Sequence, residues 1–330
     1  MVRILHGTNI DFIRWWKWAV GITAAFIMLG LASFAIHPGI NKSIEFTGGT
    51  MMQVQFTNPV DVGALRSSLD NAGVTGAEIQ QFGSVREYTV RAQNAEQRGA
   101  ATSGAETVSH QIQSILEQKY GQSNVKVIRT EAVGPRVGDE LTRDAIIAML
   151  LSFLVTTVYL AIRFEWRFGL AALVATGHDV FTTLAFIKLM HLEVSLTVVA
   201  AILTVIGYSL NDTIIIFDRV REDLRKGRKE SLYQTLNRAI NETLPRSILT
   251  HATTFAATLA LIFFAGEVIR PFALVMAFGI FTGTFSSIYI AGPVLLWIER
   301  KWPRKLGMSK GSSTATRTSP TPRSRVTAAR

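Results

Sequence analysis

Six long apolar runs constrain this chain more than any other feature of its sequence. They cover Trp15–Ile36, Ala145–Ile162, Phe168–Met190, Val194–Phe217, Ile248–Ala265 and Phe272–Ile298. A helix rises about 1.5 Å per residue and the hydrocarbon core of a bilayer is about 30 Å thick, so each run is about long enough to cross a membrane. The sequence therefore predicts a polytopic α-helical membrane protein with six transmembrane helices.

A sizeable aqueous part accompanies these runs. The mean hydropathy of +0.27 is high for a soluble protein and low for one built only of membrane helices. The 330 residues include no cysteine, which excludes a disulfide framework, a thiolate metal site and a cysteine nucleophile. The sequence also lacks a P-loop pattern, a GxSxG elbow and a metal-spaced ligand cluster. We therefore expect no enzymatic activity, no cofactor and no metal.

The net charge of +10 is distributed unevenly among the loops. Basic residues precede the first span, eight occur between positions 219 and 246, and nine more follow the last span. The two short loops on the opposite face hold only Lys188 and Arg270. By the positive-inside rule both termini are predicted to be cytoplasmic. The basic excess then follows from topology, and no nucleic-acid partner is expected.

These spans divide the chain into four parts. Residues 1–36 form the cytoplasmic N-terminus and a first helix that is too long for a signal-peptide core and is read as a retained anchor. Residues 37–143 form an extracytoplasmic domain, and 144–305 hold the other five helices with a basic cytoplasmic loop at 218–247. An amphipathic helix from Ser231 is expected in that loop, against the membrane surface or a partner. The tail 306–330, rich in Ser, Thr, Pro and Arg, is predicted to be disordered.

The extracytoplasmic domain has the pattern of a small α+β fold. Alternation predicts strands, and helical spacing predicts helices, in the order β-α-β-β-α-β typical of the ferredoxin-like unit. The segments are Ser43–Phe56, Val60–Ala72, Ala77–Phe82, Tyr88–Ala92, Gly104–Tyr120 and Asn124–Ala132. The pair Gly48-Gly49 indicates a break or bulge in the first strand. No convincing active site is apparent in this domain.

Asp212 is the residue that most strongly indicates function. An acid in a membrane helix is energetically costly and is by default a functional-site hypothesis. Asp212 lies roughly 7–8 Å from the cytoplasmic end of the fourth span. Arg246 begins the antiparallel fifth span, and its long side chain reaches a similar depth, so we predict a buried Asp212–Arg246 ion pair. Arg246 also fits an anchor that extends to the lipid headgroups, and this alternative stays open.

Other polar residues lie at membrane depth. Thr197, Thr204 and Asn211 repeat every seven residues on the fourth span, and a second stripe on the fifth span includes Thr250 and Thr254. The two stripes are expected to face each other. Asn211, Thr250, Thr254, His178 and Asp179 are candidate supporting residues, although the threonines also fit backbone bonding and His178–Asp179 a structural pair.

An acid that meets an arginine inside the membrane can take up a proton when the arginine moves away and release it on return. The sequence therefore predicts a proton relay at Asp212 and Arg246. A membrane potential supplies about 2.3 kcal/mol per charge per 100 mV. Proton flow can thus bias a change of conformation.

Five segments together resemble the SecD/SecF family, a branch of the RND superfamily. They follow one another in the family's order from Trp15 to about Lys305. The segments are IEFTGGT (Ile44–Thr50), VGPRVGDEL (Val133–Leu141), GHDV (Gly177–Val180), VIGYSLNDTIIIFDRVRE (Val205–Glu222) and NETLPRSILTHATT (Asn241–Thr254). Six spans with one modest outer domain resemble the SecF member of the pair more than SecD. Ser43 and Glu45 depart from the usual Gly and Asp of the first motif.

The resemblance implies a subunit of the bacterial Sec export machinery in the inner membrane. In this family SecD and SecF use the proton gradient to assist translocation through the SecYEG channel, after the ATPase SecA has acted. The family's functional residues match Asp212 and Arg246, and a further acid comes from SecD. Expected partners are SecD, SecYEG, the unfolded translocating protein and the lipid bilayer, with YajC, YidC and SecA as further candidates.

Three alternatives remain beside this one. An RND-type proton-coupled exporter of lipids or small molecules shares the membrane design, but one small outer domain speaks against it. An aspartyl protease built on Asp179 and Asp212 lacks the usual GxGD context. A passive scaffold predicts that the intramembrane charges are dispensable.

Overall fold

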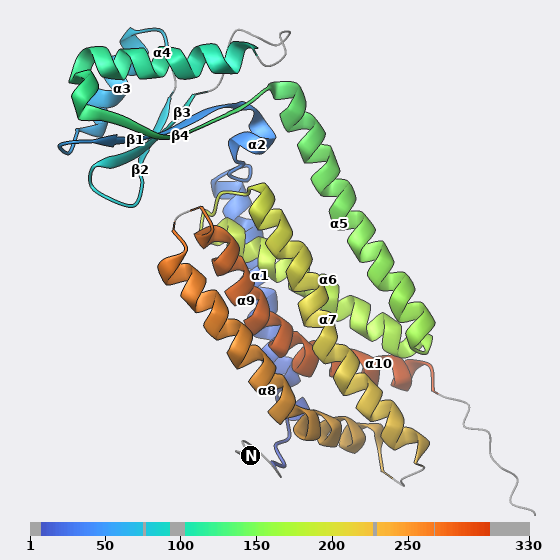
Figure 1. Cartoon of the computed structure of the whole chain (residues 1–330). Coiled ribbons are helices and arrows are strands. Elements are labelled where there is room, and N and C mark those ends of the chain that lie inside the picture. The colour runs from blue at the N-terminus through green and yellow to red at the C-terminus, as the bar shows by residue number, and fades with distance from the viewer. Residues whose placement is uncertain (1–7, 75–76, 93–102, 227–229, 267, 304–330) are drawn as a thin grey trace, which may run out of the picture.

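The computed structural model describes residues 8–74, 77–92, 103–226, 230–266 and 268–303. A bundle of long helices carries a small α+β domain at one end (Figure 1). The bundle contains η1 (Ile13–Trp15), α1 (Trp16–Ile36), α5 (Pro135–Arg163), α6 (Trp166–Leu189), α7 (Leu196–Arg225), α8 (Leu232–Phe264), α9 (Arg270–Ser286), the π-helical turn η3 (Ser287–Ala291) and α10 (Gly292–Lys301). The tail 306–330, predicted to be disordered, lies outside the described residues.

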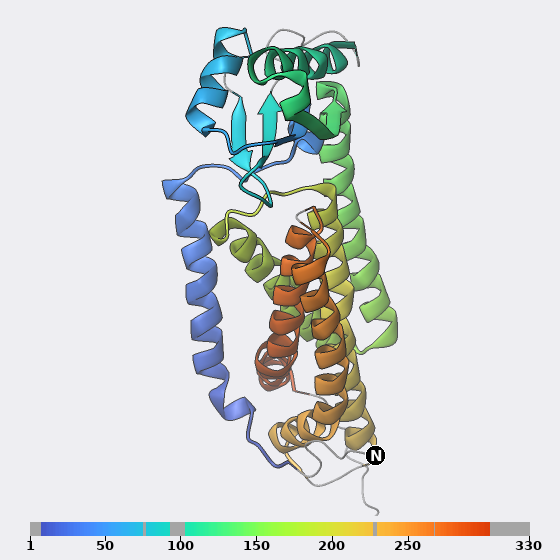
Figure 2. The same ribbon diagram turned by 60° about the vertical axis from the view of Figure 1, so that its left-hand side comes forward.

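Six helical segments of the described chain are long and apolar enough to cross a membrane, which confirms the predicted number of spans. The last of these runs continuously through α9, η3 and α10. The spans of α6, α7 and α9 are half or more buried, whereas those of α1 and α5 are almost entirely exposed. Figure 2 shows α1 and α5 on the two flanks of the bundle. The central helices are therefore the ones that can enclose a polar site.

Helices α7 and α9 approach closely because α9 presents glycines to α7. A Cβ atom on Gly279 would lie 2.1 Å from a methyl carbon of Val205, and one on Gly283 would lie 2.9 Å from Cβ of Ser209. Small residues four apart let two membrane helices come into backbone contact. The two helices consequently have little freedom to separate or slide.

Helix α8 combines the predicted cytoplasmic helix and the fifth span in one element. Ser231 begins it with a capping box, in which Ser231 and Gln234 satisfy each other's backbone amides. Its first part lies across the lower end of the bundle before the helix turns upward (Figure 1). Leu236 and Ile240 are buried in the main hydrophobic core. The apolar stripe is therefore covered by this chain itself, where the sequence predicted a membrane surface or a partner.

The α+β domain has the predicted ferredoxin-like order. Its antiparallel sheet is ordered β2-β3-β1-β4, and α3 and α4 pack against it. The elements are α2 (Ile44–Thr47), β1 (Gly49–Phe56), α3 (Val62–Asn71), β2 (Glu78–Gln81), β3 (Glu87–Ala92), α4 (Ser103–Tyr120), η2 (Gln122–Asn124) and β4 (Val125–Val133). Alternate residues of β1 meet the two helices in one apolar core, as period-2 burial requires.

The first strand is shorter than predicted. Ser43–Phe56 was expected to be one strand, but Ile44–Thr47 form the short helix α2. Phe46 of α2 is buried with Val199 of α7, and this contact favours a helical turn over a strand. Gly48 and Gly49 have φ of 70° and 123°, a region that glycine adopts readily, so the predicted break lies where the helix changes to strand.

Candidate functional site

Asp212 lies on α7 inside the bundle, with 3% of its surface exposed. Its Oδ2 atom is 3.2 Å from Nε2 of His251 on α8. The other ring nitrogen of His251, Nδ1, is 2.8 Å from Oγ1 of Thr284 on α9. Three neighbouring helices thus contribute one side chain each to a row of polar groups, which we call the Asp212–His251–Thr284 row.

Further groups hold this row in place. The ring of Tyr208 lies 5.3 Å from that of His251, and its hydroxyl donates to the carbonyl of Thr250 at 3.3 Å. A cavity of about 10 Å³ borders Asp212 and Thr284. That volume is at the lower limit for one water molecule. The row is thus tightly enclosed on the Asp212 side.

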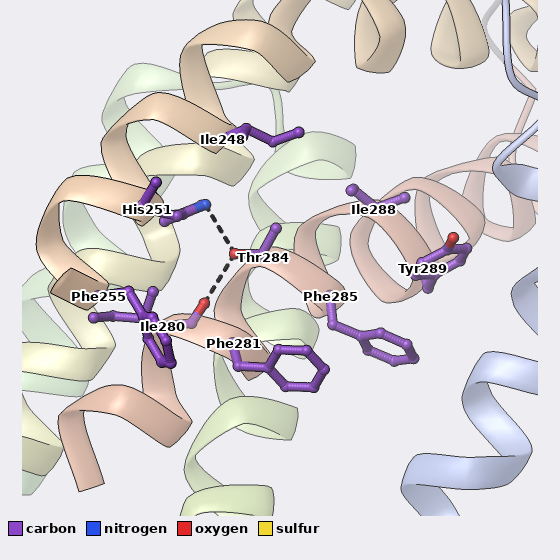
Figure 3. Close-up of a pocket in the computed structure, with 10 residues that line it drawn as sticks. Ile248, His251, Phe255, Ile280, Phe281, Thr284, Phe285, Ile288 and Tyr289 are labelled. Carbon is purple, nitrogen blue, oxygen red and sulfur yellow. Dashed lines mark hydrogen bonds between the residues drawn. The ribbon is translucent and has the colours of Figure 1, made fainter. Parts of the chain in front are cut away.

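The opposite side of His251 borders a larger, mostly apolar pocket of about 410 Å³. Figure 3 shows His251 and Thr284 turned toward each other in its wall. The remaining lining residues come from α8, α9 and η3: Ile248, Ala252, Phe255, Ile280, Phe281, Phe285, Ile288 and Tyr289. Because this wall is apolar, a positive charge on His251 is compensated chiefly by Asp212.

The predicted ion pair between Asp212 and Arg246 is wrong. Arg246 lies on an exposed side of α8, and the ion-pair partner of Asp212 among the described residues is His251. Five residues separate Arg246 from His251, which is about 140° around a helix and about 7.5 Å along it. His251 is the one of the two that lies within 4 Å of Asp212, while the charge of Arg246 acts on Asp212 from a greater distance. His251 was not among the site residues predicted from the sequence, although a polar residue within the fifth apolar span was a signal that could have identified it.

The candidate supporting residues of the two stripes do not gather at Asp212. Asn211 is exposed on α7. The hydroxyls of Thr250 and Thr254 donate to carbonyls of their own helix, at 3.0 and 2.9 Å. The backbone-bonding interpretation of these threonines is therefore confirmed. Tyr208, which follows Thr204 by four residues on α7, donates to the carbonyl of Thr250, so the expectation that the two stripes face each other stays a prediction.

Asp179 and His178 form a separate cluster on α6. Asp179 is 1% exposed. Its Oδ2 accepts hydrogen bonds from Ser209 of α7 and, at 2.6 Å, from Ser286 of α9. Nδ1 of His178 lies 3.0 Å from its Oδ1. Since Asp179 and Asp212 have different partners, the facing acids of an aspartyl protease are not formed.

Asp218, six residues beyond Asp212, has a different environment. It is exposed and pairs with Arg163 of α5 at 2.9 Å. Within the described ranges, no three His, Asp or Glu side chains are grouped so that they could hold a metal ion. Among the described buried acids, Asp223 pairs with Arg238 at 3.0 Å, whereas Asp212 and Asp179 pair with histidines.

The helix that carries Asp212 is attached directly to the α+β domain. Glu45 Oε2 accepts a hydrogen bond from the backbone N–H of Leu196, at the start of α7, at 2.6 Å. Arg91 of β3 pairs at 2.5 Å with Glu193 in the loop before α7. Backbone hydrogen bonds also join Val194 to the segment before α2. A shift of α7 would consequently be felt by the α+β domain.

Comparisons with known proteins agree with the fold and identify the family. Residues 111–301 match the family described as protein export membrane protein SecD/SecF, C-terminal, and residues 34–60 match the SecD/SecF GG motif. Protein translocase subunit SecF of Gemmatimonas aurantiaca is 62% identical over 92% of this chain and 91% of its own. Protein translocase subunit SecF of Escherichia coli O157:H7 is 36% identical over 93% and 91%.

A solved structure shares the architecture as well. The crystal structure of SecDF, a translocon-associated membrane protein from Thermus thermophilus, matches with a TM-score of 0.78 and 32% identity over 91% of this chain. The chain corresponds to 40% of that longer SecDF chain. With the family shown over most of its length, this chain belongs to the SecD/SecF family of protein-export membrane proteins, on its SecF side.

Proposed function

We propose that this chain, as a SecF-type subunit of the protein translocase, works with SecD to couple proton movement to protein export through SecYEG. The observation that carries the proposal is the buried Asp212, paired with His251 inside membrane-spanning helices. Such a pair is costly to maintain in hydrocarbon unless it serves a function. The chain is proposed to move protein and not to catalyse a chemical reaction.

The Asp212–His251 pair has two protonation states, and the attraction between the two side chains differs between them. With His251 protonated and Asp212 ionised, the two charges hold α8 against α7. When a proton from outside neutralises Asp212, the positive charge on His251 is no longer compensated. It then becomes favourable for His251 to move away from Asp212 or to lose its proton. Thr284 fixes the ring of His251 at its other nitrogen. Proton binding and release at Asp212 would thus switch the α7–α8 contact between two states.

The exposed polar groups of α7 and α8 indicate where SecD would contribute. Asn211 and Arg246 are exposed in this chain, although both lie in membrane-spanning helices. Polar groups at such positions usually face protein or water, not lipid. We place a SecD helix with its own acid against this face, where Arg246 would meet it.

The proposed topology places the α+β domain outside the inner membrane and both termini in the cytoplasm. The asymmetry of Lys and Arg between the loops supports this orientation. Motion of α7 would reach the α+β domain through Glu45 and Arg91. That domain would act on the unfolded chain leaving SecYEG. YajC, YidC and SecA remain further proposed partners.

The proposal is tested by three variants in membrane vesicles that contain SecD, SecYEG and SecA. Asp212→Asn, His251→Leu and Arg246→Met should each abolish the stimulation of export by an imposed proton gradient. Asp218→Asn, an exposed acid on the same helix, is the matched control and should export normally. If Asp212→Asn and His251→Leu retain the full gradient-dependent stimulation, proton coupling through this pair is wrong.

The apolar pocket beside His251 is the observation that favours the alternative of a proton-coupled exporter of lipids or small molecules. The single small α+β domain counts against it. A lipid or dye efflux measurement in the same vesicles separates the two functions. Efflux that depends on Asp212, with unchanged protein export, would support the exporter.

A further inference from the structure

The carboxylate of Asp179 joins three helices at one buried oxygen. Its Oδ2 receives hydrogen bonds from Ser209 of α7 and Ser286 of α9, while Asp179 itself belongs to α6. We propose that Asp179 is a positioning residue, which fixes α7 against α9 in the register that aligns the Asp212–His251–Thr284 row. This inference rests on the proposed function of that row.

The two serines lie next to the row in the sequence and in space. Ser209 precedes Asp212 by three residues, which places it about one turn away on the same helix. Ser286 follows Thr284 by two residues on α9. Asp179 therefore holds two helical turns that carry members of the row: the turn of α7 with Asp212 and the turn of α9 with Thr284. A change of register between these helices would move Asp212 and Thr284 relative to His251.

The surrounding packing makes this attachment specific. Gly283 contacts the backbone and Cβ of Ser209 so closely that a side chain there would collide. The Ser286 hydroxyl also lies 3.1 Å from the carbonyl of Gly283, so its single hydrogen can be shared between that carbonyl and Asp179. Both serines and Asp179 are almost fully buried. Loss of the acceptor would leave the buried Ser209 hydroxyl without its partner and would leave Ser286 only the carbonyl of Gly283, and an unpaired buried hydroxyl is unfavourable.

The hydrogen bonds also distinguish positioning from proton transport. Two hydroxyls donate to Oδ2, and His178 faces Oδ1, so the groups around Asp179 are arranged as donors to a carboxylate. The side-chain oxygen of an asparagine accepts the same two hydroxyl bonds but cannot be ionised. A leucine of similar size accepts none. These two substitutions therefore separate the positioning role from a titrating role.

The test compares Asp179→Asn, Asp179→Leu and Thr183→Val in the chain assembled with SecD. Thr183 is a matched control because it is buried on the same helix and no hydrogen bond is found for its hydroxyl among the described residues. The first measurement is the ¹⁵N spectrum of the His251 ring, assigned with His251→Leu. The second is gradient-stimulated protein export in vesicles.

We expect Asp179→Leu to shift the His251 ring resonances and to lower gradient-stimulated export about tenfold or more, as expected when the buried Ser209 donor is left unpaired and the link to Ser286 is lost. Asp179→Asn and Thr183→Val should keep the wild-type spectrum and stay within about twofold of wild-type export. Ser209→Ala and Ser286→Ala each remove one donor and should cause smaller shifts in the same direction. They keep the test informative if Asp179→Leu does not fold.

Two results would overturn the inference. Equal loss of export in Asp179→Asn and Asp179→Leu, with an unchanged His251 spectrum, would make Asp179 a proton carrier. A wild-type spectrum in Asp179→Leu and in both single variants, Ser209→Ala and Ser286→Ala, would show that no positioning occurs. Failure of the proposed function looks different, since Asp212→Asn would then retain gradient stimulation while Asp179→Leu still shifts the His251 resonances.

Discussion

Asp11 shows how a single residue outside the membrane ties the N-terminal segment to α8. Its Oδ1 accepts hydrogen bonds from the Tyr233 hydroxyl at 2.6 Å, from the Asn237 amide at 2.7 Å and from the Arg14 backbone at 3.2 Å. The Tyr233 hydrogen bond is the main reason why the pKa of Asp11 is lowered, and the bonds from Asn237 and Arg14 add to it. The folded state thus favours the ionised carboxylate.

The stabilisation by Asp11 should therefore depend on pH. A lowered pKa gives a contribution that is complete above the ordinary value of 3.8 and is lost as the pH falls through the lower folded-state value. At pH 7, Asp11→Asn should reduce the free energy of unfolding by at most about 1 kcal/mol, because the carboxylate is exposed. Melting temperatures of both proteins from pH 7 to pH 3 should converge at the acid end. A difference that grows toward pH 3 would contradict the assignment.

At the scale of single residues, the sequence predicted the buried acid Asp212 better than it predicted the partner of that acid. The cost of an acid in an apolar span identified Asp212. The partner depended on which side chain of α8 comes closest to Asp212, and Arg246 and His251 point about 140° apart on that helix. Depth along the helix did not decide between Arg246 and His251. The hydrogen bonds of Asp179 involve three helices, so no local pattern predicts them.

At the scale of elements, the contact of α7 with α9 depends on glycine. A methyl group on Gly279 would lie 2.1 Å from one methyl carbon of Val205 and 2.7 Å from the other, and Val205 is itself buried. Gly279→Ala should therefore separate the helices and destabilise the protein by about 1–3 kcal/mol, as overpacking does. The thermal stability of the purified protein measures this loss.

Gly21 on α1 supplies the control for that substitution. A Cβ atom there meets no other atom within 4 Å. Alanine is the better helix former, so Gly21→Ala should be neutral or stabilise the protein by up to about 1 kcal/mol. If Gly279→Ala proved as stable as Gly21→Ala, the close contact of α7 with α9 would not constrain the bundle.

The long elements followed from the sequence, whereas their junctions did not. Six apolar runs and two amphipathic helices are set by periodic patterns in the chain itself. The helix α2 instead forms where Phe46 packs on Val199, more than a hundred residues away. Helix α8 likewise continues through Pro245, because its first part is buried in the core. Such tertiary contacts override the local pattern at the ends of elements.

At the scale of the whole molecule, the helix that carries Asp212 connects the bundle to the α+β domain. Asp212 lies on α7, and the start of α7 is held by Glu45 and by the loop that Arg91 contacts. Glu45 is well placed for this, because a carboxylate is favourable at the positive end of a helix. These contacts are polar and reversible, so they can transmit a shift of α7 without being part of either core.

The last prediction concerns this connection. Arg91→Ala removes the ion pair with Glu193 and should lower gradient-stimulated export about threefold to fivefold, as expected for a partly exposed pair worth about 1 kcal/mol. Exchange of the charges in Arg91→Glu with Glu193→Arg should restore part of the loss because the pair is re-formed, but not all of it, because Glu78, which pairs with Arg91 at 3.5 Å, would then face an acid. Arg129→Ala on β4, which breaks an ion pair with Glu131 within the α+β domain, is the matched control. Equal export by the Arg91 and Arg129 variants would mean that the domain and α7 are not coupled through this contact.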